Sequence, residues 1–353
     1  MLAAATALAA ATLTACACGS GSDPGADGGT DASVDASPTP DGGPAPDAGP
    51  AQDAGTDAGL LGPPYPIVLA HGFFGFDDFA GIGFVTYYHG VREALAARGE
   101  TLVYTPEVDP FNDSTVRGAQ LVARIEEILA ETGHDKVNII GHSQGGLDAR
   151  VVAFERPDLV ASITTVATPH RGSRVADVIL GLVSDGRLRD LVDELVRVIG
   201  APLYDEVGME TSVVTALGAF SAGGIAEFNM RYPDRISVDY YSLTGASDRN
   251  WDPACEPRDA PEFIRRWSGD RDPIDPLLAV SEAILDGGLG DPFPNDGLVR
   301  VVDARWGTFL GCVPADHLDE VGQLLGDDPG LLNDFDHLQM YGELVEWLRA
   351  QGY

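Results

Sequence analysis

The chain has 353 residues, of which 44% are hydrophobic, and a formal net charge of −33. A charge of this sign and size argues against nucleic acid as a partner. The four cysteines have no spacing typical of a zinc site, and Lys136 is the single lysine among many arginines.

Residues 1–16 form an apolar, alanine-rich segment that ends at Cys16. Its last residues, Leu13-Thr-Ala-Cys16, resemble the lipobox of bacterial lipoproteins, in which a signal peptide is removed and the new N-terminal cysteine is lipidated. The segment is too short for a transmembrane helix but lacks the basic residues that usually begin a signal peptide. We expect export, with Cys16 anchored at the cell surface or outer membrane. An ordinary cleaved signal, giving a secreted protein, is the alternative.

Residues 17–62 consist mainly of Asp, Gly, Ala, Pro, Ser and Thr and contain no basic residue. Such a segment buries too little apolar surface to offset the entropy lost on ordering, so it is predicted to be a disordered linker. Its simplest role is a spacer between an anchor and the domain of residues 63–353, which is long enough for a complete core.

Strands and helices alternate in the pattern of residues 63–353. Short β-branched runs predict the strands and one-sided apolar spacing predicts the helices. This alternation predicts the α/β class, with a parallel sheet covered by helices. Strands are expected at 66–70, 102–106, 137–140, 162–167, 239–245 and 298–302, and helices at 91–98, 117–131 and 145–155. A further helical segment, predicted to form a lid, lies within residues 174–226.

Gly141-His-Ser-Gln-Gly145 lies between a predicted strand and a predicted helix. Gly-x-Ser-x-Gly in this context is typical of a nucleophile elbow, which places the Ser143 hydroxyl at the edge of the sheet. The helix that follows offers free N–H groups and a positive dipole end to a developing oxyanion. In α/β-hydrolases the oxyanion hole takes one N–H from the residue after the serine and one from the loop after the first strong strand. Here these donors would be Gln144 and Phe73.

Several stretches of this chain resemble the true bacterial lipases of the Pseudomonas and Burkholderia type, and they occur in the same order over nearly all of residues 63–330. The resemblance implies an α/β-hydrolase fold with a mostly parallel central sheet, helices on both faces and a helical lid. It also implies triacylglycerol lipase activity. The matching stretches are 65–76, 88–90, 116–121, 136–146, 168–173, 228–233, 295–299 and 317–321.

A serine nucleophile needs a base and an acid that orients the base. The resemblance implies Asp296 as the acid and His317 as the base. His337 is the rival base, because many hydrolases have a histidine before their last helix. Of the other histidines, His142 is expected to be turned away by the elbow and His71 to support the oxyanion turn.

The resemblance further implies a structural calcium ion beside the loop of the catalytic histidine. Hard cations prefer oxygen ligands, and this ion would hold the loop without taking part in the chemistry. The implied ligands are the side chains of Asp275 and Asp319 and the main-chain oxygens of Gln323 and Asp327. Asp272 is an alternative to Asp275, one of these ligands.

Cys255 and Cys312 are the only cysteines beyond the linker, and in an exported domain they are expected to form a disulfide bond. The family also has a disulfide in this region.

Together these observations predict a serine hydrolase of lipid carboxylic esters, most specifically a triacylglycerol lipase. A short-chain carboxylesterase or a polyester depolymerase is the alternative among enzymes. A catalytically silent, tethered surface-binding domain is the alternative of another class. The expected partners are a lipid or ester substrate, a membrane or lipid interface, and a dedicated folding chaperone of the kind that many family members need.

Overall fold

The computed structural model describes residues 60–73, 87–109, 112–181, 217–247, 255, 257–270, 272–286, 293–323, 326, 329 and 333–353. The predicted signal, Cys16 and almost all of the predicted linker lie outside the described residues. So do residues 182–216 of the predicted lid and the predicted ligand Asp327. None of the helices within the described ranges combines the length and hydrophobicity needed to cross a bilayer.

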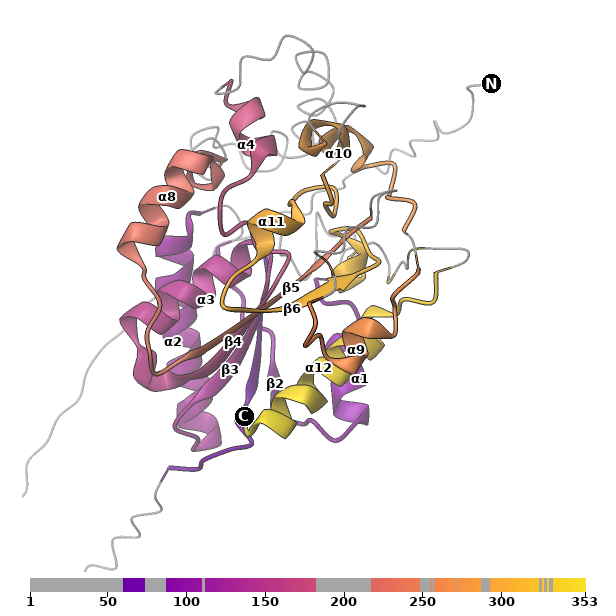
Figure 1. Ribbon diagram of the computed structural model, residues 1–353. Coiled ribbons are helices and arrows are strands. Elements are labelled where there is room, and N and C mark those ends of the chain that lie inside the picture. The colour runs from indigo at the N-terminus through magenta and orange to yellow at the C-terminus, as the bar shows by residue number, and fades with distance from the viewer. Residues whose placement is uncertain are drawn as a thin grey trace, which may run out of the picture. The chain divides into compact units, whose positions relative to one another are not determined.

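Six parallel strands form the central sheet, in the order β2-β1-β3-β4-β5-β6 (Figure 1). Every residue of the inner strands β1, β3 and β4 is buried, as expected for a sheet covered on both faces. This burial explains why their sequences contain no Asp, Glu, Lys or Arg. The strands are β1 (Ile67–Ala70), β2 (Val103–Tyr104), β3 (Val137–His142), β4 (Val160–Val166), β5 (Asp239–Gly245) and β6 (Thr308–Val313).

Helices cover both faces of this sheet (Figure 1). The longest are α2 (Ser114–Thr132), α3 (Gln144–Glu155) and α12 (His337–Gln351). The others are α1 (Val91–Ala97), α4 (Arg174–Ile179), α8 (Ala222–Arg231), α9 (Glu262–Arg265), α10 (Ala279–Leu285) and α11 (Val301–Ala304), with 3₁₀ turns at Pro157–Leu159 and Asp319–Val321.

The alternation of side chains along β1 divides the core into two layers. Ile67 and Leu69 pack in one hydrophobic cluster with residues of α1 and α12. Val68 and the other alternate residue, Ala70, pack in a second cluster with residues of α2 and α3. The two helix layers therefore lie on opposite faces of the sheet. The observed fold is the predicted α/β arrangement.

The prediction of a strand at 298–302 was wrong. This segment is a turn that leads into the short helix α11, and the last strand, β6, begins only at Thr308. Val299 and Val301 are buried, but Val299 lies in a tight turn that follows Asp296, with a single bridge between Asn295 and Arg300, and Val301 is the first residue of α11. Their alternating pattern therefore reflects burial of a loop and not strand pairing.

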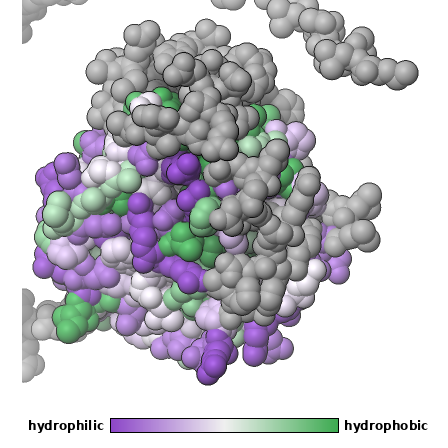
Figure 2. Space-filling model, turned by 45° about the horizontal axis from the view of Figure 1, so that its top comes forward, coloured by the Kyte–Doolittle hydropathy of each residue, from purple (hydrophilic) through white to green (hydrophobic). Residues whose placement is uncertain are grey.

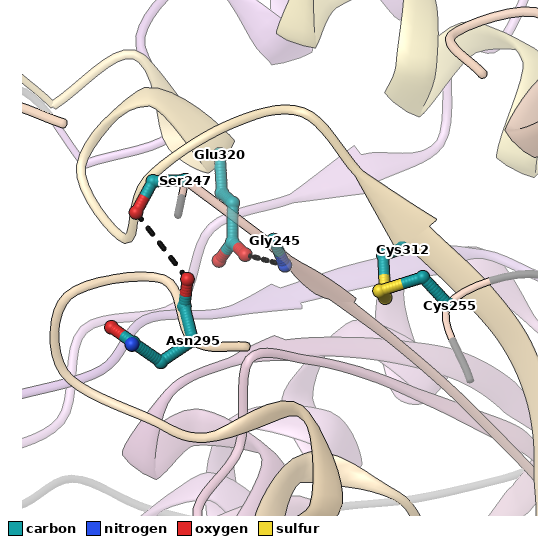
Figure 3. The surroundings of a disulfide bond; sticks show 6 residues. All are labelled: Gly245, Ser247, Cys255, Asn295, Cys312 and Glu320. Carbon is teal, nitrogen blue, oxygen red and sulfur yellow. Dashed lines mark hydrogen bonds between the residues drawn. A yellow bond between two sulfur atoms is a disulfide. The ribbon is translucent and has the colours of Figure 1, made fainter. Parts of the chain in front are cut away.

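A disulfide bond joins Cys255 to Cys312 of β6 (Figure 3), in agreement with the expected pairing. Cys312 lies opposite Thr244 of β5. The bond therefore ties the segment before α9 to the edge strand of the sheet.

The carboxyl ends of the strands all lie at one edge of the parallel sheet. Ligands of open α/β sheets bind outside this edge. The segments that leave it include His71-Gly72 after β1, Ser143 after β3, Thr168 after β4 and His317 after β6. This edge is therefore where a functional site is expected.

Candidate active site

Ser143 lies in a strained turn between β3 and α3. Its backbone has φ 54° and ψ −125°, a conformation that residues other than glycine rarely adopt. A Cβ at Gly141 would lie 2.6 Å from the main chain of Gly145, and one at Gly145 would collide with the carbonyl of Ala70. The two glycines thus allow the close packing that lifts the Ser143 side chain to the edge of the sheet, where the residue is half-buried.

Asp296 and His317 are hydrogen-bonded to each other. His317 Nδ1 donates to Asp296 Oδ2 over 2.8 Å. The other carboxylate oxygen, Oδ1, accepts the main-chain N–H groups of Leu298 at 2.8 Å and Val299 at 2.6 Å. Both oxygens of this fully buried carboxylate are therefore engaged, and the imidazole is held with Nε2 left for another partner.

The elbow and the histidine loop meet at the same edge. The ring of His142, next to the serine, lies 4.5 Å from the ring of His317 between centroids. A Cβ at Gly72 would lie 2.7 Å from the Cβ of Ser143. The segments that carry the predicted nucleophile, base and oxyanion donor are therefore adjacent in the fold.

His337, the rival base, has a different environment. It begins α12, and its Nε2 donates to the main-chain carbonyl of His89 over 2.8 Å. A side chain at Gly322 would collide with the His337 ring, so this ring supports the loop that follows His317. The expected acid, Asp296, hydrogen-bonds His317, which favours His317 over His337 as the base.

The predicted oxyanion donors occupy suitable main-chain positions. Gln144 is the first residue of α3, so its N–H has no carbonyl partner within the helix. The Gln144 side chain is anchored by donation from Nε2 to the carbonyl of Asn112 over 2.8 Å. Phe73 follows Gly72 directly, and its ring packs edge-on against Phe220.

His71 supports the turn before Phe73, as predicted. The main-chain N–H of Val108 donates to His71 Nε2 over 3.2 Å, which leaves Nδ1 as the donor to the carbonyl of Gly72 at 3.0 Å. The two bonds therefore fix one neutral tautomer of His71.

Arg117 of α2 also contacts this turn, and the sequence analysis predicted no role for it. Its guanidinium is fully buried and donates from Nη2 to the carbonyls of His71 at 2.6 Å and Gly72 at 3.3 Å. Nε pairs with Asp148 of α3 over 2.8 Å. Burial raises the pKa of Asp148 to about 6, although Arg117 lowers it. The available signal was an arginine on the apolar face of α2, one turn before Leu121.

Asp319 lies in a buried cluster of three carboxylates with Asp272 and Asp316. One oxygen from each lies within 4.8 Å of the others. Asp275, the expected ligand, is outside this cluster: its carboxylate accepts the N–H of Leu277, and its own N–H donates to Asp316. The alternative residue, Asp272, takes its place.

The carboxylate cluster has the chemistry of a hard-cation site. Asp272 Oδ2 is buried and has no hydrogen-bond partner among the described residues. Burial, followed by repulsion from Asp316 and Asp319, raises the pKa of Asp272 to about 9. A buried carboxylate without compensation is costly, and a cation with oxygen ligands would supply that compensation. Gln323, one of the predicted ligands, is buried in the same loop.

Comparison with known proteins agrees with this geometry. Residues 65–295 match the model of the alpha/beta hydrolase fold family. A triacylglycerol lipase of Vibrio cholerae is 35% identical over 303 residues, which cover 82% of this chain and 88% of that protein. The chain belongs to the bacterial lipases of the α/β-hydrolase family.

Further relatives have the same character. A triacylglycerol lipase of Pseudomonas fragi is 30% identical, with 82% of this chain and 97% of the relative covered. A triacylglycerol lipase of Burkholderia plantarii is 31% identical, with 74% and 80% covered. Among solved structures, EstA from Clostridium botulinum aligns with a TM-score of 0.54 at 19% identity, covering 82% of this chain and 89% of EstA. This last likeness concerns the fold.

Proposed function

We propose that the protein is a triacylglycerol lipase in which Ser143 is the nucleophile, His317 the base and Asp296 the acid. The protein is a carboxylic ester hydrolase of the bacterial lipase family. The observation that carries the assignment is the buried Asp296–His317 hydrogen bond, beside a serine elbow, at the carboxyl edge of the sheet.

The reaction follows from these positions. The Ser143 oxygen attacks the ester carbonyl while His317 Nε2 takes its proton, and the N–H groups of Phe73 and Gln144 stabilise the oxyanion. His317 then returns the proton to the departing alcohol, which leaves an acyl-enzyme. A water molecule, deprotonated by His317, releases the fatty acid and restores the serine. Asp296 keeps the imidazole oriented and stabilises its charge.

A lipid interface is the surface on which we expect this enzyme to work. In Figure 2, where the top of the view in Figure 1 comes forward, hydrophobic side chains reach the surface beside hydrophilic ones. Around α10 and α11 the large hydrophobic residues Leu277, Phe293 and Val302 are 49%, 40% and 46% exposed. Exposed apolar residues beside a site favour contact with an apolar substrate phase.

A series of esters tests the substrate class. Initial rates are measured on the purified chain with soluble nitrophenyl esters from butyrate to palmitate and with emulsified triolein. A triacylglycerol lipase hydrolyses triolein and accepts long chains. Turnover confined to the shortest soluble esters supports a short-chain carboxylesterase, hydrolysis of a polyester film without triolein supports a depolymerase, and no turnover supports a binding domain.

Calcium is the cation that we propose for the carboxylate cluster. Asp272, Asp316 and Asp319 would supply side-chain oxygens and Gln323 a main-chain oxygen. Asp319 lies two residues after His317, so the ion would hold the loop that carries the base. It would supply structural stability and no chemical step.

Export and lipidation at Cys16 are the localisation that we propose, with a secreted form as the alternative. The support is the apolar segment that ends at this cysteine and the charged, small-residue segment that follows. Metabolic labelling with an alkyne fatty acid tests the anchor. We expect label in the membrane fraction for the unchanged chain and release of unlabelled protein for Cys16→Ser. The need for a dedicated folding chaperone is tested by expressing the chain with and without the exported proteins of its own host. The amount of active enzyme obtained is then compared.

A further inference from the structure

A row of hydrogen-bonded polar side chains lies in the core directly behind the proposed catalytic groups, and none of the roles above uses it. It consists of Tyr87, His142 and Glu320, whose exposed fractions are 7%, 0% and 0%. We refer to it as the Tyr87–His142–Glu320 row.

The row is continuous. The Tyr87 hydroxyl lies 2.5 Å from His142 Nδ1, and His142 Nε2 lies 2.8 Å from Glu320 Oε2. The second carboxyl oxygen of Glu320 accepts the N–H of Gly245 (Figure 3). At the other end the Tyr87 hydroxyl lies against Gly72, where a Cβ would collide with it. Both nitrogens of the His142 ring are therefore engaged, and the ring cannot turn without breaking a buried bond.

Each member touches a segment that carries a part of the proposed machinery. Gly72 precedes the oxyanion donor Phe73, and His142 precedes Ser143. Glu320 follows His317 by three residues in the same loop. Three distant stretches of the chain are thus joined through one set of side chains.

The far end of the row reaches the acid loop. Gly245 ends β5, and two residues later the N–H of Ser247 donates to the carbonyl of Asn295 over 2.9 Å, next to Asp296. The Ser247 hydroxyl donates to the same carbonyl over 3.3 Å, the bond drawn in Figure 3. The row therefore also contacts the strand that supports the acid.

The row is also in direct contact with the proposed base. The His142 ring lies 4.5 Å from the His317 ring between centroids, with the planes inclined by 46°. One ligand-type atom from each of His142, His317 and Glu320 lies within 4.8 Å of the others. The His317 imidazole therefore rests on a ring whose position the row fixes.

We propose that Tyr87, His142 and Glu320 are positioning residues of the hydrolysis, which hold the oxyanion segment, the elbow and the histidine loop in register. This inference rests on the proposed function. Buried polar groups are costly unless paired, so each bond of the row fixes the separation of the two segments that it joins. A displacement of about 1 Å at reacting groups costs roughly a hundredfold in rate. The row therefore affects the rate of the chemical step, kcat, and has little effect on substrate binding.

Tyr87→Phe tests the row with the smallest change, because it removes one hydroxyl and keeps the ring. Tyr341→Phe is the matched control: Tyr341 belongs to the same hydrophobic cluster, is fully buried, and its hydroxyl has no hydrogen-bond partner among the described residues. kcat and KM are measured on a soluble nitrophenyl ester, with active sites counted by an organophosphonate. We expect Tyr87→Phe to lower kcat by roughly ten- to a hundredfold with KM within about twofold, and Tyr341→Phe to match the unchanged protein.

Glu320 provides the conservative pair. Gln at position 320 can accept from Gly245 and donate to His142, whereas Ala breaks both bonds. We therefore expect Glu320→Gln to keep most of the kcat that Glu320→Ala loses, each per titrated site.

The proposal is overturned if Tyr87→Phe has unchanged kcat per titrated site, whatever happens to its melting temperature, or if Tyr341→Phe loses as much. It is also overturned if Glu320→Gln is as slow as Glu320→Ala. Ser143→Ala in the same assay separates this result from the proposed function, because an active Ser143→Ala protein removes the serine mechanism itself.

Discussion

Asp296 holds His317 at two points. Its carboxylate accepts Nδ1–H of the ring over 2.8 Å, and its main-chain carbonyl accepts the N–H of His317, also over 2.8 Å. The backbone bond sets the position of the residue and the side-chain bond sets the rotation of its ring. The orientation of His317, the proposed base, is therefore established by the fold alone, before any substrate binds.

Replacing Ser143 by Ala is expected to abolish ester hydrolysis, with a loss of about 10⁶ in kcat. The hydroxyl lies at the edge of the sheet and holds no core contact, so the fold should persist. Turnover of a soluble ester and the circular dichroism melting curve check both parts. A folded variant with near-normal turnover would rule out the serine mechanism.

His317→Ala should be as damaging as Ser143→Ala, whereas His337→Ala should retain most activity. The bond from His337 to the His89 carbonyl and its contact with Gly322 give it a structural role, so a lower melting temperature is expected there. kcat and melting temperature are compared for the two variants. Loss of kcat in His337→Ala alone would transfer the role of base to that residue.

Arg117→Met should lower both activity and stability. It removes the donor that holds the carbonyls of His71 and Gly72, and it leaves Asp148 as a buried charge without its partner, a change that typically costs about 3–5 kcal/mol. The double variant Arg117→Met/Asp148→Asn removes the unpaired charge. We expect it to recover melting temperature and not kcat, since the oxyanion turn still lacks its support.

Equal recovery of melting temperature and kcat in the Arg117→Met/Asp148→Asn variant would contradict the role of Arg117 in the turn. The guanidinium would then matter only as the partner of Asp148.

Removal of calcium should lower the melting temperature more than it lowers activity at 25 °C. An ion that binds only the folded state adds about 2.7 kcal/mol at a hundredfold excess over its Kd. Melting curves are recorded with excess chelator and with millimolar calcium. Asp272→Asn should reduce the difference in melting temperature between calcium and chelator. Asp275→Asn, the control outside the cluster, should leave that difference unchanged. Identical melting temperatures in chelator and calcium, on protein stripped of metal, would falsify the site.

The calcium effect should grow with pH. The raised pKa of Asp272, about 9 against an ordinary 3.8, means that the metal-free folded state holds a proton that the unfolded chain releases above about pH 4. Its stability is therefore expected to fall as pH rises from about 4 toward 9, whereas calcium replaces the proton. The gap between melting temperatures with calcium and with chelator should widen between pH 5 and 9. A gap independent of pH would contradict this assignment.

The elbow could be predicted from sequence because its constraint is local. A positive φ at Ser143 brings Gly141 and Gly145 against neighbouring main chain, and only glycine fits there, so the requirement is written in five consecutive residues. The strands could be predicted equally well where they are wholly buried. The predicted strand at 66–70 contains β1, and β3 begins at its predicted residue, Val137.

The edge strand β6 was harder to predict, because it begins at the exposed Thr308, is only partly buried and has a glycine, Gly311, within it. The apolar residues at 298–302 were mistaken for that strand, since burial in a tight turn produces the same pattern as burial in a sheet. The carboxylate cluster shows another limit. Which of Asp272 and Asp275 joins Asp319 depends on how a loop folds back, and both choices have the same chemistry in the sequence.

The single lysine has a practical consequence. Lys136 immediately precedes β3, and Ser143 follows the last residue of that strand. Seven steps along the strand at about 3.3 Å each place the two at opposite edges of the sheet, roughly 23 Å apart. Arginine is inert to amine-coupling reagents, so only this ammonium and the N-terminal amine would react. Molecules immobilised through Lys136 on an activated resin would share one orientation, with the edge that carries Ser143 facing the solution.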